Sequence, residues 1–421
     1  MNRSERFIIS LVAAFCFAAP HPLRAEGITL LSCLEDSRRN NPDLAVLRLD
    51  PEIQKGTLSI ARSTILPRVD LQGGFTALAR PQAVRFGGFT QETQEPRFPF
   101  ASLTATQILY DFGKRDARIQ REESLLSASD SRVEEVRQEI FSQVTEAFYA
   151  VARADSIRSV ARDEVEMRKK HLYDVEELLA AGVVTRNDQL LAEVKLAESR
   201  QNLLAAETAL ENAWLRLNHL TGRPPSTRGE IELQLPSTAP PEKSPTEHPA
   251  ITLQKRTIEA LERELTEAEA AHRPDLFARL SVDYVDNGKV REQTMYTATI
   301  GLAMNLFDGN ASRSRVAVIR STLEREKRRL ASLNAAIDLA RNVARNDLRL
   351  AEERLSVSQK TIEQSTEHLR IATERYRERI GTSTDVIDAQ TLLSLSRSRH
   401  ANDRFDREIA RVRLLRAEGV L

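Results

Sequence analysis

Prolines are distributed very unevenly along the 421 residues, and their absence from two long tracts constrains the fold most. None of the sixteen prolines lies between Pro99 and Pro224, and none follows Pro274. In both tracts apolar residues such as Val133 and Val136 recur at spacings of three and four, with charged residues between them. This pattern predicts highly charged helices with narrow apolar seams, which suit coiled-coil packing better than burial in a globular core.

Glycines divide the two tracts in the same way. They lie at positions 113, 182 and 222 in the first tract and at 309, 381 and 419 in the second. Each tract is therefore predicted to form a long helix, a hairpin turn at Gly182 or Gly381, and a shorter return helix. The expected ranges are 114–181 and 310–380 for the long helices, and 184–221 and 384–418 for the return helices.

The segments before the long helices also match, which indicates an internal duplication. Asn41-Pro42-Asp43-Leu44 corresponds to His248-Pro249-Ala250-Ile251, and Leu109-Tyr110-Asp111 corresponds to Leu306-Phe307-Asp308. Two copies of one unit of about 200 residues are therefore predicted, over 26–222 and 248–421, each beginning with a helix. The expected strand-to-helix turns contain Tyr110, Asp111, Gly113, Phe307, Asp308 and Gly309.

Alternating apolar and polar residues precede each long helix, and this period of two predicts strands. The expected strands cover about 68–79, 98–109, 275–286 and 294–306, with an Asp-Asn-Gly turn in the second copy and a long connection at 80–96 in the first. Ten-residue strands with one apolar face fit a transmembrane barrel, or a soluble hairpin beside a coiled coil. Because four strands cannot close a barrel, a membrane barrel would need two or three chains.

The first 25 residues have the pattern of an export signal. Arg3 and Arg6 precede the apolar run Phe7–Ala19, and a plausible cleavage site places the mature start at Glu26. The mature chain then keeps a single cysteine, Cys33, so an intramolecular disulfide is excluded.

The segment 223–247 is rich in proline and is predicted to connect the two copies. The stretch from Gly222 to Pro249 contains seven prolines, with Pro249 included. A free, disordered linker and an ordered extended connection both fit this composition.

Composition excludes several classes of function. The 61 basic residues balance the 61 acidic ones, so there is no basic surplus for nucleic acid. A mean hydropathy of −0.40 excludes a bundle of membrane-spanning helices. The seven histidines are scattered without ligand spacing, and no phosphate loop or nucleophile motif is present. We therefore expect no enzyme, no metal site and no cofactor.

The order of these features, over the whole mature chain, resembles the TolC-like outer-membrane efflux family. The most specific stretch is Gly381-Thr382-Ser383-Thr384-Asp385-Val386-Ile387-Asp388-Ala389-Gln390, which is similar to the family's motif at the periplasmic helix turn. The resemblance implies a mainly α fold with a β-barrel part and four transmembrane strands per chain. It also implies a homotrimer, whose 12-stranded barrel in the outer-membrane lipid of a Gram-negative cell continues as an α-helical barrel in the periplasm.

The resemblance further implies the function of an exit duct. Such trimers serve tripartite efflux pumps or type I secretion, together with a periplasmic adaptor (membrane fusion) protein and an inner-membrane transporter. In this family the proline-rich connection wraps the middle of the helical barrel. The alternative from another class is a periplasmic coiled-coil adaptor or structural scaffold without a pore.

Asp385 and Asp388 are the candidate residues for the periplasmic gate. They lie three residues apart, so they share one helix face after Gly381. The resemblance implies that they line the narrow entrance, where a trimer would gather six carboxylates that attract cations. The alternative is that Asp385 caps the return helix and Asp388 lies in its first turn. With Gly182 aligned to Gly381, the first copy has Arg186 and Gln189 at these positions.

How the closed entrance is held is left open by the sequence. Some family members use a Tyr and an Arg beside this turn, and here Glu378 and Ser383 occupy the nearest positions. Arg377, Arg379 and Arg186 are the candidates that could pair with the acids instead.

Overall fold

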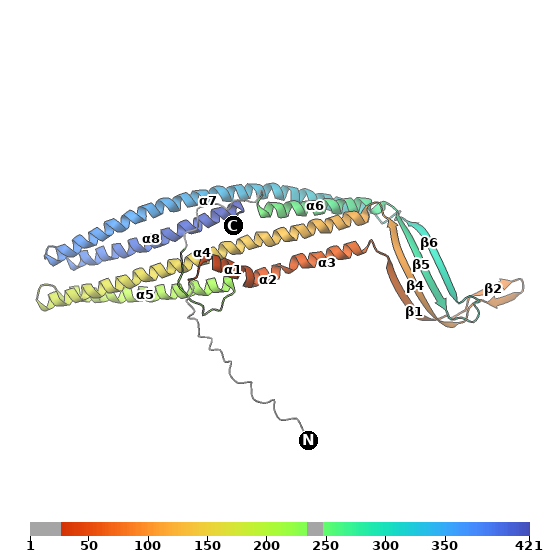
Figure 1. The fold of residues 1–421 in the computed structure, drawn as a ribbon, viewed down its shortest axis with the longest axis horizontal. Helices are drawn as coiled ribbons and strands as arrows, with labels where there is room; N and C mark the ends of the chain where they lie inside the picture. The colour runs from red at the N-terminus through yellow and green to blue at the C-terminus, as the bar shows by residue number, and fades with distance from the viewer. Residues whose placement is uncertain (1–26, 234–246) are drawn as a thin grey trace, which may run out of the picture.

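The computed structural model describes residues 27–233 and 247–421. The expected signal peptide over 1–25 and the centre of the expected connection over 223–247 lie outside these residues. The described chain is elongated, with paired long helices toward one end and a small antiparallel sheet toward the other (Figure 1). The two helical hairpins end at the tip farthest from the sheet.

Two long helices run most of the length of the molecule. Helices α4 (Lys114–Ala180) and α7 (Ala311–Arg377) each contain 67 residues, which corresponds to about 100 Å at 1.5 Å per residue. Each returns toward the middle as a shorter helix of 36 residues, α5 (Arg186–Thr221) or α8 (Ser383–Glu418). Helix α4 packs against α5 and α8, and α7 packs against α8.

The helix preceding each strand pair differs between the copies. The first copy has three short helices, α1 (Leu30–Asn40), α2 (Pro42–Leu47) and α3 (Leu49–Ser63), whereas the second has α6 (Pro249–Glu269) followed by the 3-10 turn η1 (Ala270–His272). The first helix breaks where the Asn41 side chain accepts hydrogen bonds from the backbone of residues 43 and 44 and starts α2 afresh.

The main sheet has four antiparallel strands, two from each copy. Its strands are β1 (Arg68–Ala77), β4 (Arg97–Tyr110), β5 (Asp275–Val285) and β6 (Thr294–Ala303), in the spatial order β1-β4-β5-β6. The β4–β5 pairing joins the copies, with Leu103 opposite Val282. Strands β1 and β6 each have one neighbour only, so within the described residues the sheet is open at both edges.

A small second hairpin lies in the first copy, where the sequence predicted only a long connection. Strands β2 (Ala83–Phe86) and β3 (Phe89–Glu92) pair around Gly87-Gly88 and extend beyond the main sheet (Figure 1). Its base is held by the turn between β5 and β6, because the Asn287 side chain accepts a hydrogen bond from the Glu95 backbone at 3.1 Å. Each strand has four residues, which is too short for a period of two to be recognised.

The apolar core is concentrated where α1, α4, α5 and α8 meet, at mid-length. Its largest fully buried side chains include Phe148 and Val144 of α4, Leu217 of α5 and Phe405 of α8. Toward the hairpin tips the seams become narrower. Along α7, small residues are buried at seven-residue intervals: Ala344, Ala351, Ser358, Ser365 and Ala372. This is coiled-coil spacing, and small side chains let α7 and α8 approach closely.

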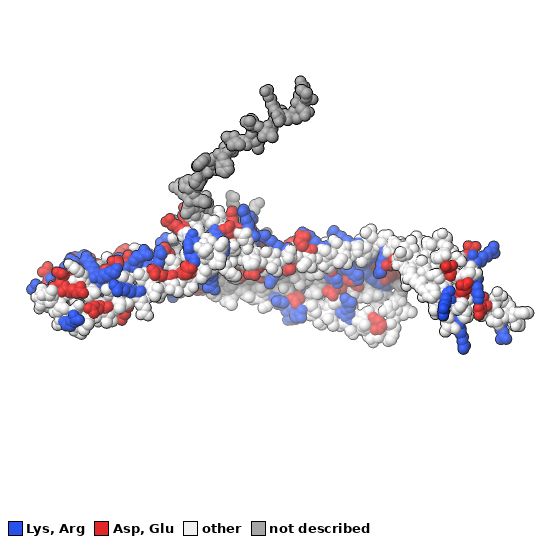
Figure 2. All heavy atoms as spheres, turned by 90° about the horizontal axis from the view of Figure 1, so that it is seen from below, with Lys and Arg blue, Asp and Glu red and all other residues white. Residues whose placement is uncertain are grey.

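Charged residues of both signs are mixed over the helical part of the surface in view, whereas few appear where the helices join the sheet (Figure 2). Among the helices within residues 27–233 and 247–421, none combines the length and the apolar character needed to cross a bilayer. The fold class predicted from the sequence is confirmed: the chain is mainly α, with a duplicated unit and four long strands.

Candidate functional site

The two faces of the sheet have opposite chemistry. In the register of the strands, Leu71 lies opposite Leu103, Leu103 opposite Val282, and Val282 opposite Tyr296, so one face is apolar across all four strands. Most of the side chains on this face are exposed in the single chain, with Leu71 78% and Ile300 75% accessible. Such exposure of a continuous apolar surface requires a partner or lipid to cover it.

The opposite face carries polar side chains. Thr104 lies opposite Asp70 on one side and Ser281 on the other, and Arg279 lies opposite Thr299. Asp283 on this face accepts hydrogen bonds from the hydroxyls of Ser102 and Ser281. The sheet therefore presents an apolar face and a water-compatible face along its whole width.

The strand-to-helix turns predicted from the sequence are held by Asp111 and Asp308. The Asp111 carboxylate accepts hydrogen bonds from the backbone and side chain of Arg115, at 2.9 and 2.8 Å, and Asp308 accepts from the backbone of Ser312 at 2.9 Å. In each turn two successive residues have positive φ: Phe112 and Gly113 in the first copy, Gly309 and Asn310 in the second. Tyr110 contacts Phe112 edge-on, and Phe307 is 81% exposed.

The arginine in the first of these turns also ties three elements together. The Arg115 side chain donates to the backbone carbonyls of Thr64 and Ile108, at the ends of α3 and β4. The turn of the second copy has Ser312 in the corresponding place and lacks this tie. In the first copy the Arg115 side chain thus links the start of α4 to the ends of α3 and β4.

The two hairpin turns use the same backbone geometry with different residues. After α4, Gly182 has φ +70° and the Val183 N–H donates to the Leu178 carbonyl. After α7, Arg379 has φ +63° and the Ile380 N–H donates to the Arg375 carbonyl. Both are helix ends in which a left-handed residue lets the next N–H reach back to the last turn.

Gly381 is therefore not the counterpart of Gly182, although the sequence suggested that it was. Gly381 lies two residues after the left-handed position, and a Cβ there would be 3.2 Å from the Arg375 Cβ. The helix caps give the true correspondence, because α5 begins after Thr185 and α8 after Thr382. By this register Asp385 corresponds to Asp188, and Asp388 corresponds to Leu191.

The predicted alignment, in which Arg186 and Gln189 of the first copy correspond to Asp385 and Asp388 of the second, is thus wrong. Both turns carry a capping box: the Asp385 N–H donates to the Thr382 hydroxyl at 3.2 Å while the Asp385 carboxylate accepts from the Thr382 N–H at 2.8 Å. Thr185 and Asp188 make the same pair of contacts. The hydrogen bonds from Thr382 lower the pKa of Asp385 below its ordinary value.

Asp388 lies one turn further along α8 and is exposed. Among the described residues neither Asp388 nor Asp385 forms an ion pair. The candidate partners Arg377, Arg379 and Arg186 therefore do not pair with these acids in the single chain. Arg186 instead donates to Gln189 at 2.8 Å. Asp388 is thus an acidic group on the second return helix where the first return helix has Leu191.

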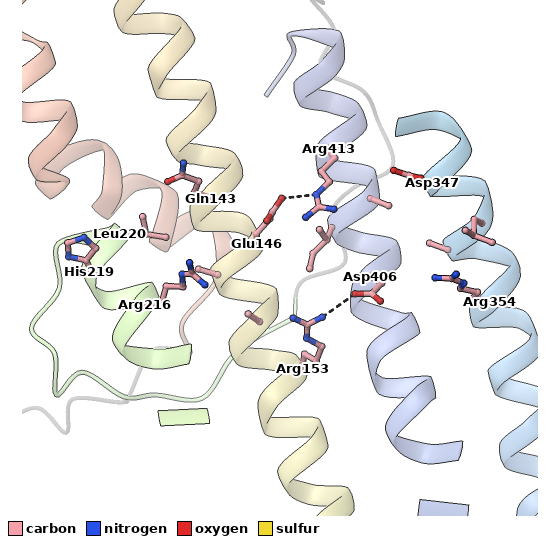
Figure 3. A pocket seen from close by; sticks show the side chains of 16 residues that line it. Gln143, Glu146, Arg153, Arg216, His219, Leu220, Asp347, Arg354, Asp406 and Arg413 are labelled. Atoms are coloured by element: carbon pink, nitrogen blue, oxygen red, sulfur yellow. Dashed lines mark hydrogen bonds and ion pairs between the residues drawn. The ribbon is translucent and has the colours of Figure 1, made fainter. Parts of the chain in front are cut away.

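The hairpins are joined side by side along α4 and α8. At mid-length Arg413 points to Glu146 at 2.9 Å and Arg153 points to Asp406 at 3.1 Å, across a groove of about 670 Å³ (Figure 3). These pairs are largely exposed, so each contributes little to stability.

A second junction, closer to the tips, was not predicted from the sequence. Arg168 of α4 is 3% exposed and donates to the Gln390 side chain at 2.9 Å and to Thr391 at 2.7 Å, both on α8. His171, one turn along, lies 3.0 Å from the Ser383 hydroxyl. The signal in the sequence was a cation and a histidine at seam positions, since Val165 and Val175 are buried on the same side of α4.

Comparisons with known proteins decide the family. The outer membrane efflux protein family matches residues 33–223 and 243–420, which together are most of the chain. The chain belongs to the outer membrane efflux protein family. Members of this family are trimeric outer-membrane channels that work with adaptor proteins and inner-membrane transporters. The resemblance and the localisation predicted from the sequence are confirmed: this efflux-family protein is located in the Gram-negative outer membrane, with its helical part in the periplasm.

Curated relatives and solved structures agree with this assignment. The chain is 23% identical over 426 residues to Protein CyaE of Bordetella pertussis, covering 97% of this chain and 88% of that one. It is 25% identical over 299 residues to the cobalt-zinc-cadmium resistance protein CzcC of Cupriavidus metallidurans, covering 68% and 69%.

The fold is similar to that of crystallised outer-membrane channels. The outer membrane protein VceC of Vibrio cholerae superposes with a TM-score of 0.82 at 18% identity, over 93% of this chain and 96% of that one. The CmeC channel of Campylobacter jejuni superposes with a TM-score of 0.81 at 15% identity, over 93% and 85%. These efflux-family folds extend over both copies of the duplicated unit.

Proposed function

We propose that three copies of this chain form a continuous duct, which is the outer-membrane exit of a tripartite efflux pump or of a type I secretion system. A periplasmic adaptor protein and an inner-membrane transporter deliver the solute to its helical end. The observation that carries the proposal is the four-stranded sheet with one apolar face and two open edges. Family membership supports the trimeric state.

The open edges define how copies join. In an antiparallel sheet of four strands the first and last run in opposite directions, so β6 of one copy can pair with β1 of the next without breaking the pattern. Unpaired strand edges are not tolerated in lipid, so the sheet must close. Three copies with four strands each give the twelve strands of the proposed barrel.

The two faces of the sheet define what lies inside and outside. The apolar face, with Leu71, Val282 and Ile300, meets the lipid, and the polar face, with Asp70 and Arg279, lines the lumen. The solute therefore passes through an aqueous channel rather than through the lipid.

The helices offer a matching seam outside the membrane. Helices α3 and α7 are the outermost helices next to the sheet, because α3 packs on α4 from one side and α7 packs on α6 and α8 from the other. Each presents exposed aliphatic side chains: Ile53 and Ile60 on α3, Val318 and Leu339 on α7. Ile53, Ile60 and Leu339 each lie two residues after a buried position, about 200° around the helix, so they point away from their own chain.

At the periplasmic tips, we propose that Asp388 lines the entrance and that Asp385 combines this position with its capping role. Both carboxylates are exposed, Asp385 in the first turn of α8 and Asp388 in the second. In a trimer they form a ring of six acids, whose mutual repulsion and negative potential favour cations. Gly182 and Gly381 then belong to the turns that shape this rim.

The proposal is tested with the exported protein in its own membrane. We expect it to fractionate with the outer membrane, to be extracted by detergent as a trimer, and to conduct ions in a planar bilayer. Recovery as a soluble periplasmic monomer would instead support the scaffold without a pore.

A matched pair of variants tests which face meets lipid. Ile300→Arg places a charge on the apolar face and is expected to cost about 2–4 kcal/mol per strand at mid-membrane, which prevents insertion. Thr299→Arg, the adjacent residue on the polar face, should still insert and should lower cation selectivity. Equal insertion of both variants would contradict the assignment of the faces.

A further inference from the structure

The two helical hairpins are held together near their tips by a buried cation. The Arg168 guanidinium reaches from α4 into α8, where the Ile387 carbonyl, the Gln390 side chain and the Thr391 hydroxyl accept its hydrogen bonds at 2.7–3.2 Å. All three acceptors are neutral. The nearest carboxylate is Glu164 on α4 itself, at 3.5 Å. The positive charge at this junction is therefore only weakly balanced.

His171 makes the second tie between the hairpins. Its ring is 4% exposed, its Nε2 lies 3.0 Å from the Ser383 hydroxyl at the start of α8, and its plane is tilted against the Tyr376 ring of α7, with the ring centroids 5.7 Å apart. One imidazole thus contacts both helices of the second hairpin. Burial, and then the nearby Arg168 cation, lower the pKa of His171, which Asp174 opposes.

Protons can reach this ring from solvent. A cavity of about 410 Å³ lies beside it and is lined partly by the exposed side chains of Lys170 and Glu177. The titratable and charged groups around His171 come from α4, α7 and α5, and α8 contributes neutral groups, chiefly Ser383 and Gln390. Those charged or titratable groups are Arg168, Lys170, Asp174 and Glu177 on α4, Tyr376 and Arg377 on α7, and Asp188 on α5, which acts on the Tyr376 hydroxyl.

The direction of the pH effect follows from these contacts. With the hairpins together, His171 is buried beside a guanidinium, so the neutral ring is favoured. With the hairpins apart, the ring is solvated and titrates near its ordinary value of about 6.5. The stabilisation of the joined arrangement is therefore complete above about pH 6.5 and declines as the pH falls below it.

We propose that Arg168, His171, Ser383 and Gln390 form an acid-sensitive clasp that holds the second hairpin against the first and releases it when His171 is protonated. The proposal rests on the duct function, because release at the tips widens the periplasmic entrance. Three clasps act together in a trimer, one in each copy, so a small effect per copy is multiplied. Acidification of the periplasm then favours opening without any change in the partner proteins.

The test measures conductance of the full-length trimer in planar bilayers at about pH 7.5 and about pH 5, on either side of the histidine's ordinary pKa. For the unmodified protein we expect the mean conductance to rise about threefold or more on acidification. His171→Gln keeps a hydrogen-bonding side chain that cannot take up a proton, and should abolish most of the rise. His219→Gln, at an exposed histidine in the last turn of α5 and away from the tips, is the matched control and should keep it.

Two further variants keep the test decisive if His171→Gln is unstable. Arg168→Gln and Ser383→Ala each remove one tie, and both should raise the conductance at about pH 7.5. Trimer mass and circular dichroism verify folding in each case. An inserted trimer that conducts equally at both pH values, or a His171→Gln variant that keeps the full rise, overturns the clasp alone. Absence of conductance at both pH values overturns the duct and the clasp with it.

Discussion

The two long helices, α4 and α7, have the same length and similar ends, yet they occupy opposite environments. Helix α4 packs against α1, α3, α5, α6 and α8, so it lies at the centre of the chain. Its seam contains large side chains such as Phe148 and Val151, both buried. Helix α7 packs mainly against α6 and α8, and its C-terminal half buries mainly alanine and serine.

This difference shows how a duplicated unit can specialise. The local signals were kept in both copies: an aspartate before each long helix, a left-handed residue after it and a capping box at the start of each return helix. The buried side chains of the two long helices differ because α4 packs at the centre of the chain, whereas α7 lies at its edge, where a neighbouring copy can pack against it. Four sets of substitutions test this contrast.

The largest effect is expected in the centre. Phe148→Ala removes a side chain that is 2% exposed in the core between α4, α5 and α8, and should lower the free energy of unfolding by about 3–5 kcal/mol. Thermal unfolding followed by circular dichroism measures the change. Tyr173→Ala, on the same helix but 61% exposed, is the control and should shift the midpoint little. Similar shifts for both variants would contradict the central role of the α4 seam.

Substitutions on the outer side of α7 should weaken trimer assembly rather than the folding of the single chain. Leu339→Asp replaces an exposed leucine on the outer side of α7, and we expect loss of trimer at a cost of about 2–3 kcal/mol per copy, the value of burying a leucine. The mass of the detergent-solubilised protein reports the change. Ala340→Asp adds the same charge to the adjacent exposed position and should leave the trimer intact. A stable Leu339→Asp trimer would exclude this side of α7 from the interface.

Substitutions at the left-handed residues of the two hairpin turns should change the free energy of unfolding by about 1 kcal/mol or less, with opposite signs. Gly182→Ala introduces a Cβ at φ +70° and should destabilise by about 1 kcal/mol, whereas Arg379→Gly relieves the same strain at φ +63° and should be neutral or stabilising. Unfolding midpoints of the two variants measure the contrast. A destabilised Arg379→Gly variant would show that the arginine side chain has a role that its backbone geometry does not reveal.

The smallest effect on stability is expected at Asp388. Asp388→Asn should leave the unfolding midpoint unchanged and reduce the preference for cations, measured as a reversal potential in asymmetric salt. Asp385→Asn should also weaken the cap of α8 and lower the unfolding midpoint slightly. Because hydrogen bonds lower the pKa of Asp385, its capping contribution is complete above about pH 4 and is lost as the pH falls below its folded-state pKa. Unchanged selectivity in both variants would leave only the cap.

Much of the fold could be predicted because its signals are local and periodic. Absence of proline, apolar residues at spacings of three and four, and alternation before each long helix are all readable within one segment. None of these local signals predicted that β4 of the first copy pairs with β5 of the second. The break between α1 and α2, and the hairpin of β2 and β3, were missed because each depends on a cap or a turn of a few residues.

The candidate site was harder to predict, for two physical reasons. A glycine at 381 suggested a left-handed turn there, but in the structure Arg379 adopts that conformation, which shifted the comparison of the tips by two residues. The clasp joins Arg168 to Gln390, which are more than 200 positions apart and have no shared motif. Contacts of this kind are set by how the hairpins pack.

The β4–β5 pairing has a consequence for how the protein is made. Leu103 must find Val282, 179 positions later, so this step carries a large loop-closure entropy and is expected to be slow. The β1–β4 pair closes a shorter loop and can form as soon as the first copy has been exported. Until the second copy arrives, the β4 edge of this pair has no partner strand and its apolar side chains are exposed. We therefore expect the exported chain to be prone to aggregation in the periplasm, and its yield to depend on chaperones that cover this surface.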